Sequence, residues 1–272
     1  AEKAALAFLA ADTTGVCSTK DLAAADPLLA TRMVYGSGAQ AVEQSVASRL
    51  MTLWSSEGVV VRATVAGGWT SSQFRWASAE HWLGRTLDSS PANIRTGSLV
   101  VARDYVERYG PVTIDDLQWW TGWTKTHTRA ILTALLDDGV IAPVAVAEGE
   151  AFVGAEDSGE VAPPEPWGAL LPALDPSSMG WKHRDFSLGQ HRDFVYDRNG
   201  NAGPTAWVDG RIVGGWAVRD DGTVALALAE AVTTAERELL AAKAEALTSF
   251  LDGAVIKPRA RGWTEAEKIA RG

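Results

Sequence analysis

The chain has 272 residues, which is enough for one large or two ordinary domains, and 46% of them are hydrophobic, as in soluble globular proteins. No apolar run approaches the roughly 18 residues that indicate a membrane span, and no basic-then-apolar signal segment opens the sequence. The single cysteine, Cys17, excludes an internal disulfide framework and fits a reducing compartment. We therefore expect a cytoplasmic protein that has no membrane partner.

The formal net charge of -9 is unevenly distributed along the chain. Residues 137–166 carry eight acidic side chains and no Lys or Arg, which leaves a net charge of -1 for everything else. Residues 254–272 carry five basic and two acidic side chains. A local basic face is therefore possible, although the overall charge gives nucleic-acid binding no support.

The first part of the chain predicts three helices and a strand. Residues 2–11 form an Ala- and Leu-rich helix pattern, and Ser18 followed by Asp21 is a capping-box-like helix start. A loop rich in Gly and Ser leads to a further helix that ends near Glu57, where a strand begins. The chain starts inside a helix pattern and without Met, so we expect a fragment or a processed chain.

Residues 112–140 repeat this order more clearly. Thr113 followed by Asp116 is a second capping-box pattern, and Gly122 can end the short helix in the left-handed conformation. Thr124 can cap another helix, which Gly139 ends before an extended segment. Helix, tight turn, helix and strand are the outline of a winged helix-turn-helix.

The two stretches predict tandem winged helices, an internal repeat of architecture more than of residues. We expect the modules at residues 1–87 and 98–155, with a linker at 88–97 and a Pro- and Glu-rich connection at 156–166. Two unrelated helical hairpins remain the alternative.

The pattern changes from residue 167 onward. Asp209-Gly210 is a hairpin turn signal between two apolar strands, and Asp221-Gly222 marks a second turn. Thr233 with Glu236 begins a helix, and residues 255–258 are a possible last strand. We predict an antiparallel β unit with a packing helix at residues 167–258 and a flexible tail at 259–272.

Several motifs resemble one bacterial family. They are the segments at residues 170–181, 197–205 and 208–216, together with those at 69–73 and 119–123. The family contains winged-helix DNA-binding domains, is common in actinobacteria, and is related to DNA glycosylases that excise alkylated bases and unhook interstrand crosslinks. The resemblance covers essentially the whole chain. It implies an α+β fold of tandem winged helix-turn-helix repeats, followed by a small antiparallel β-barrel-like unit with a C-terminal helix.

The same resemblance bears on activity. Characterised glycosylases of the group use a Gln-x-Gln or Gln-x-Asp motif in a winged helix that would precede this chain. The sequence contains neither motif, and Gln40 and Gln44 are wrongly placed and spaced. The resemblance in fold therefore does not imply that this chain has glycosylase activity.

Base excision needs a group that positions water and stabilises a cationic sugar. Asp175 and Asp185 are the available carboxylates in the segment of strongest resemblance. The alternative is that Asp175 caps a turn before Pro176 and that Asp185 pairs with Arg184 or Lys182.

Basic and amide side chains at three places are candidate DNA contacts. The first group is at the start of the helix after Thr124 and contains Lys125, His127 and Arg129. The second group is in a turn and contains Arg198, Asn199 and Asn201. The third group is in the first module and contains Arg49, Arg62 and Arg75. The Asn-Gly-Asn sequence at 199–201 is equally typical of a turn with no binding role. For the helix after Thr124, the alternative is protein packing, for which many winged helices use the corresponding helix.

The remaining residues predict little further chemistry. Four histidines and one cysteine show no zinc-ligand spacing, and no nucleotide-binding loop is present, so we expect no metal and no cofactor. Trp54, Trp120 and Trp207 lie in apolar patterns and are expected in the core.

The sequence therefore predicts a protein that binds double-stranded DNA, possibly damaged DNA. One alternative is a fragment of an active glycosylase that excises alkylated bases. Another is a transcriptional regulator or protein-interaction module without catalysis, which the acidic balance favours.

Overall fold

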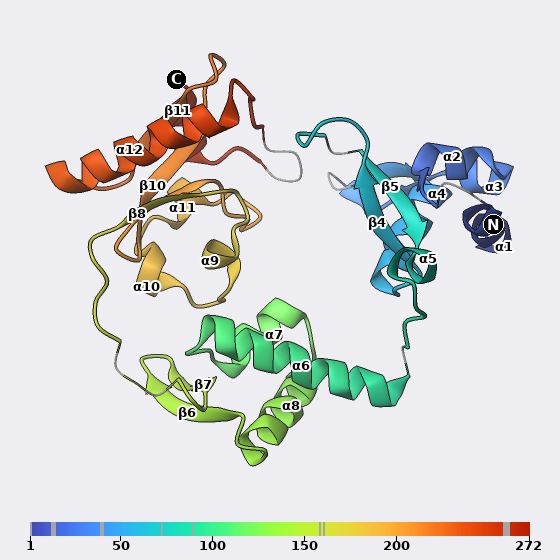
Figure 1. The fold of residues 1–272 in the computed structure, drawn as a ribbon, viewed down its shortest axis with the longest axis horizontal. Coiled ribbons are helices and arrows are strands. Elements are labelled where there is room, and N and C mark those ends of the chain that lie inside the picture. The colour runs from blue at the N-terminus through green and yellow to red at the C-terminus, as the bar shows by residue number, and fades with distance from the viewer. Residues whose placement is uncertain are drawn as a thin grey trace. The chain divides into compact units, whose positions relative to one another are not determined.

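A computed structural model describes residues 2–11, 15–38, 41–71, 73–88, 90–157, 159, 161–257 and 262–272. The chain divides into two compact units, Ala1–Ser90 and Pro91–Gly272 (Figure 1). No helix in these described ranges is long and apolar enough to cross a membrane.

Unit 1, Ala1–Ser90, combines short helices with a three-stranded antiparallel sheet in the order β1-β5-β4 and a two-stranded one formed by β2 and β3. Its helices are α1 (Glu2–Ala11), α2 (Thr19–Ala24), α3 (Pro27–Ala30), α4 (Val46–Ser56) and α5 (Ala79–Leu83), and its strands are β1 (Cys17–Ser18), β2 (Arg32–Tyr35), β3 (Val42–Ser45), β4 (Val60–Val65) and β5 (Phe74–Ser78). The predicted capping box forms at α2, where the hydroxyl of Ser18 accepts a hydrogen bond from the N–H of Asp21 at 3.1 Å. Leu22, Met51 and Trp54 lie in the buried core between these helices.

The Gly- and Ser-rich loop expected before α4 is wrong in part, because β2 and β3 form a hairpin there. Arg32 lies opposite Ser45, and the side chain of Arg32 forms an ion pair with Glu43 at 3.2 Å. Each of these short strands is stabilised by pairing with the other strand, and the sequence pattern within one strand does not show this pairing. Ala39 and Gln40 lie outside the described residues.

Unit 2, Pro91–Gly272, opens with three helices and a hairpin. These are α6 (Pro91–Tyr109), α7 (Ile114–Thr121), α8 (Lys125–Asp137), β6 (Ile141–Val146) and β7 (Gly149–Gly154). The predicted starts and stops are confirmed here, since Gly122 ends α7 with a φ of 72° and Thr124 caps α8. Apolar side chains of α6 and α8, including Val106, Ile131 and Leu132, are buried against one another.

Two predictions for this part are wrong. Residues 91–97 belong to α6 and not to a linker, because Pro91 stands at the start of the helix, where a proline costs no hydrogen bond. Trp120 is 47% exposed, whereas Trp54 and Trp207 are buried as expected. Trp120 lies in the last turn of α7, where its ring packs against that of Tyr105 of α6, with the ring centres 5.0 Å apart, and it stays partly open to solvent.

The rest of unit 2 is built around an open four-stranded antiparallel sheet in the order β11-β10-β9-β8. Its strands are β8 (Gly168–Leu171), β9 (Thr205–Val208), β10 (Arg211–Val218) and β11 (Val224–Leu228). The predicted turn at Asp209-Gly210 joins β9 to β10, and both residues adopt positive φ. The barrel-like closure is wrong, because the outer strands β8 and β11 do not pair with each other in this sheet.

Helices cover both faces of this sheet. The long helix α12 (Thr234–Leu251) packs along one face, with Leu240 buried beside Val208 and Val213 (Figure 1). On the other face lie α9 (Pro176–Met179), α10 (Asp185–Leu188), α11 (Arg192–Val195) and α13 (Glu265–Arg271), which share a core with β9 and β10.

Helix α13 corrects the expectation of a flexible tail for residues 262–272, whereas residues 259–261 lie outside the described residues. Ala266 and Ala270 are buried against the sheet, and the carboxylate of Glu267 accepts a hydrogen bond from the N–H of Thr264 at 3.0 Å in a capping box. Small side chains let the helix lie close to β10, a contact that the short sequence pattern alone does not show. The possible strand at 255–258 is also wrong for residues 255–257, and Pro258 lies outside the described residues.

Candidate functional site

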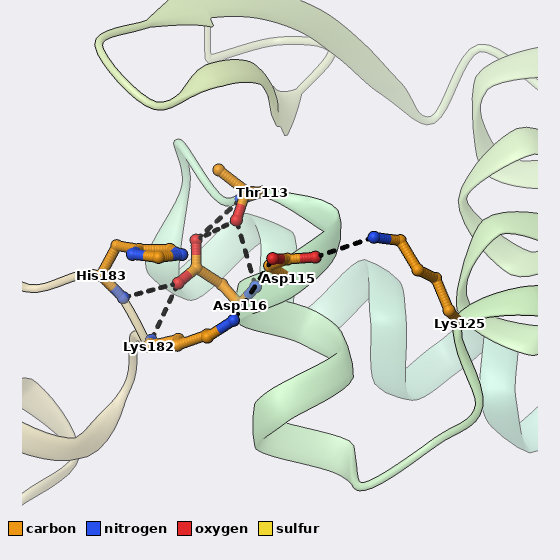
Figure 2. Close-up of polar contacts among 6 residues, drawn as sticks. All are labelled: Thr113, Asp115, Asp116, Lys125, Lys182 and His183. Atoms are coloured by element: carbon orange, nitrogen blue, oxygen red, sulfur yellow. Dashed lines mark hydrogen bonds and ion pairs between the residues drawn. The ribbon is translucent and has the colours of Figure 1, made fainter.

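The buried carboxylate of Asp116 connects the start of α7 to the segment that precedes α10 (Figure 2). One oxygen accepts hydrogen bonds from the N–H and the hydroxyl of Thr113 at 2.9 and 2.7 Å. The other accepts from the backbone N–H groups of Lys182 and His183 at 2.8 and 3.1 Å. Asp116 is 3% exposed, and these bonds satisfy a charge that would otherwise be costly to bury.

The neighbouring Asp115 lies at the surface between two lysines (Figure 2). Its carboxylate forms ion pairs with Lys125 at 3.4 Å and with Lys182 at 3.3 Å. The hydrogen bond from Lys182 and the charge of Lys125 lower the pKa of Asp115. Exposed pairs of this kind contribute only about 0–1 kcal/mol, so the ion pair with Asp115 holds Lys125 only weakly.

The other two candidates on α8 have different surroundings. The Nε2 atom of His127 is 3.1 Å from the hydroxyl oxygen of Ser98, and its ring packs edge-on against Trp123. Arg129 is exposed and forms no ion pair with any residue that the structure describes. Of the three residues predicted at the start of this helix, Arg129 is therefore the most available to a ligand.

The candidates in unit 1 do not form a single cluster. Arg62 of β4 lies over the rings of Phe74 and Trp76, at 4.8 and 5.5 Å from the ring centres. Arg75 of β5 points to the opposite face of the hairpin, because side chains alternate along a strand. Arg49 of α4 lies over Tyr35, at 5.3 Å. All three arginines are exposed.

The predicted turn before β9 is organised by Asp197. Its carboxylate accepts hydrogen bonds from the N–H groups of Asn199, Asn201 and Gly262, and from the side-chain amide of Asn201 at 3.1 Å. Burial alone would raise the pKa of Asp197, but these bonds lower the pKa to about 2. Asn201 therefore has a structural role, whereas the side chains of Arg198 and Asn199 are exposed.

The two candidate carboxylates lie at the starts of separate short helices. Asp175 caps α9 by accepting a hydrogen bond from the N–H of Ser177 at 2.8 Å, as its alternative interpretation predicts. Asp185 is exposed as the first residue of α10. The pairing of Asp185 with Lys182 or Arg184 is wrong, because Lys182 pairs with Asp115 and Arg184 with no carboxylate in the described part of the chain.

Sequence reasoning missed the environment of Arg184. Its guanidinium is buried and lies over the rings of Trp119 and Tyr196, at 4.9 and 5.0 Å from their centres. A basic residue between Trp181 and Phe186 was the only available signal. The stacking partners come from distant parts of the sequence, so no local pattern reveals them.

No group of three or more His, Cys, Asp or Glu side chains within the described ranges is arranged to hold a metal ion. The candidate residues described above are mainly cations, amides and aromatic rings, which are groups that proteins use to bind phosphates and bases.

Comparisons with known proteins bear on the family of this chain. The structure is similar to that of the DNA glycosylase AlkZ of Streptomyces sahachiroi, with a TM-score of 0.66 and 20% sequence identity, over 95% of this chain and 68% of that one. A likeness at this identity shows the fold alone. A search of curated proteins gave no match. The model of the AlkZ-like DNA glycosylase family matches residues 1–250, in agreement with the resemblance seen in the sequence, and the chain therefore belongs to that family.

Proposed function

We propose that this chain is a DNA-binding protein that holds duplex DNA through two winged helix-turn-helix modules and the sheet unit that follows them. The observation that carries the proposal is the match to a DNA glycosylase family over residues 1–250, which spans both modules and the sheet. We place the modules at residues 1–87 and 98–155, the second of them extended back to Pro91 by the start of α6, and the sheet unit at 167–258 together with α13.

The order of elements supports the tandem modules. In unit 1, α2 begins with a capping box, α3 and the β2–β3 hairpin come between it and α4, and β4 and β5 then pair as a hairpin. In unit 2, α7 begins with a capping box, α8 follows, and β6 and β7 pair as a hairpin. A second helix followed by a hairpin is the order of a winged helix, in which that helix enters the major groove and the hairpin is the wing.

Exposed cations and amides would make the contacts. In unit 2 these are Lys125 and Arg129 on α8, with Arg198 and Asn199 on the turn before β9. Arg49, Arg62 and Arg75 are the corresponding cations of unit 1. Because the whole chain carries a net charge of -9, binding would depend on these local groups and would weaken steeply with salt.

The test is binding to a labelled duplex, with and without an alkylated base, across a salt series. We expect an affinity that falls with salt, is higher for the damaged duplex, and is reduced in Arg129→Gln. Lys243→Gln is the matched control, because Lys243 is an exposed cation on α12. Flat or undetectable binding at low salt would contradict the proposal and favour a protein-interaction module.

Family membership also favours a second function, the excision of alkylated bases. In that reaction water adds to the sugar carbon as the bond to the base breaks, and a carboxylate can orient the water and stabilise the positive charge on the sugar. Asp185 is the better placed of the two candidates, because it is exposed, whereas Asp175 caps α9.

The test of excision is chromatographic detection of the free base released from an alkylated duplex. Release that is lost in Asp185→Asn but retained in Asp193→Asn, an exposed aspartate of α11, would support this assignment. No release by a chain that still binds the duplex would leave DNA binding as the function.

A further inference from the structure

Arg184 is a buried cation without a carboxylate partner in the described part of the chain. It is 6% exposed, and its Nη1 atom donates hydrogen bonds to the carbonyl oxygen of Ser178 at 2.8 Å and to the hydroxyl of Tyr196 at 3.2 Å. Its Nε atom is fully shielded and has no hydrogen-bond partner. A buried charge is expensive when no opposite charge compensates it, so the arrangement is suited to an anion supplied from outside the chain.

A second arginine lies beside the first. The guanidinium of Arg192, on α11, lies over the ring of Tyr196 at 5.6 Å, so Arg184 and Arg192 share one aromatic ring. Arg192 is exposed and forms no ion pair with the residues described. It also lies near the turn before β9, because a methyl group at Gly200 would be 3.5 Å from its Nη2 atom.

Two further aromatic side chains are exposed in this part of the chain, and one of them contacts Arg184. Trp119 stacks on Arg184 and is 40% exposed, and Phe186, two residues after Arg184, is 65% exposed. Guanidinium groups bind phosphate oxygens in a planar, two-pronged geometry, and exposed rings stack on bases. Cations and rings together fit a nucleotide better than they fit a simple anion.

We propose that Arg184, Arg192 and Tyr196 form a binding site for a backbone phosphate of DNA, next to which Trp119 stacks on a base or sugar. Arg192 contacts the phosphate from the surface, and Arg184 supplies a second positive charge behind the shared ring. This inference rests on the proposed DNA binding and adds a contact that lies outside both predicted winged-helix modules, apart from Trp119.

The experiment measures the binding of a labelled duplex by fluorescence anisotropy across a sodium chloride series. We compare the unsubstituted chain with Arg192→Gln, Arg184→Lys and the control Arg237→Gln, an exposed arginine on α12. Arg192→Gln should weaken binding by about tenfold at low salt and reduce the salt slope by about one, as the loss of one phosphate contact does. Arg184→Lys should weaken binding while changing the slope less, because it keeps the charge and loses the planar guanidinium.

Arg184 also holds Ser178 and Tyr196, so the variants are first checked for cooperative thermal unfolding. Arg192→Gln removes an exposed side chain, and its result stands even if Arg184→Lys fails to fold. A second arm adds inorganic phosphate at constant ionic strength. We expect phosphate to displace no more DNA than chloride does, and strong displacement that disappears in Arg192→Gln would assign the site to free phosphate instead.

The outcomes separate this inference from the proposed function. If the unsubstituted chain does not bind duplex DNA at low salt, the proposed function fails. If it binds, but Arg192→Gln and Arg184→Lys keep the affinity and slope of the unsubstituted chain, the phosphate site is overturned while DNA binding stands.

Discussion

The carboxylate of Asp116 accepts a hydrogen bond from the backbone N–H of Lys182 at 2.8 Å, across 66 positions of the sequence (Figure 2). The same carboxylate closes the capping box of α7 through Thr113. One side chain therefore starts a helix and also anchors the segment that carries Arg184. Any change at Asp116 is expected to affect both.

Asp116→Ala should lower the free energy of unfolding by about 3 kcal/mol, because it removes one half of the capping box of α7 and the acceptor of the part-buried hydrogen bonds from the N–H groups of Lys182 and His183. Urea unfolding followed by circular dichroism measures this change. The matched control is Asp115→Asn, which removes only exposed ion pairs and should cost less than about 1 kcal/mol. Equal effects of the two variants would mean that the buried contacts of Asp116 do not stabilise the fold.

The turn held by Asp197 should give stability a dependence on pH. The pKa of Asp197 is about 2 in the folded protein, below the value of about 3.9 for an unfolded chain. Its stabilising contribution is therefore fully present above pH of about 4 and is lost as the pH falls toward 2. Urea unfolding should show Asp197→Asn to be less stable than the unsubstituted chain at pH 7.

The size of that difference should shrink as the pH is lowered through this window, because the protonated carboxyl resembles the amide. Asp193→Asn is the control, since Asp193 is an exposed aspartate of α11. A difference that stays constant down to the acid limit of folding would show that the charge of Asp197 is not the cause.

The same substitution at two glycines should have opposite effects. A methyl group at Gly180 would overlap the ring of Tyr109 and lie 2.9 Å from the carbonyl oxygen of Pro176, so Gly180→Ala should cost about 2 kcal/mol or more. Gly97 lies in α6 with open space around it, so Gly97→Ala should raise stability by about 0.5–1 kcal/mol. Thermal unfolding of both variants measures the contrast, and a stable Gly180→Ala would rule out the tight packing against Tyr109.

Substitutions at the two ends of the turn before β9 should have different effects, one on DNA binding and the other on stability. Arg198→Gln should weaken duplex binding several-fold and reduce the salt slope by about one, without changing the unfolding midpoint. Asn201→Ala should lower stability by about 1 kcal/mol instead, because its amide donates to Asp197. Anisotropy and urea unfolding of both variants provide the comparison, and a loss of stability in Arg198→Gln with unchanged binding would reverse the assignment.

Short-range patterns were sufficient for most helix starts and turns. The capping boxes at Ser18, Thr113 and Thr233 and the turn at Asp209-Gly210 form as predicted, because each depends on hydrogen bonds or backbone angles within three or four residues. The same holds for Asp175, whose role as a cap follows from its place before Pro176.

Other features were decided by contacts between distant segments. Helix α13 replaces the expected tail because Ala266 and Ala270 pack against a sheet that forms about fifty residues earlier. The partner of Lys182 is Asp115 and not Asp185, and Trp119 and Tyr196 enclose Arg184 from separate parts of the chain. Sequence spacing carries no information about which cation a carboxylate or ring will meet across such distances. The sequence alone therefore determined the capping motifs, which depend on neighbouring residues. The ion pair of Lys182 and the rings around Arg184 were decided only by the packing of the sheet unit against α7.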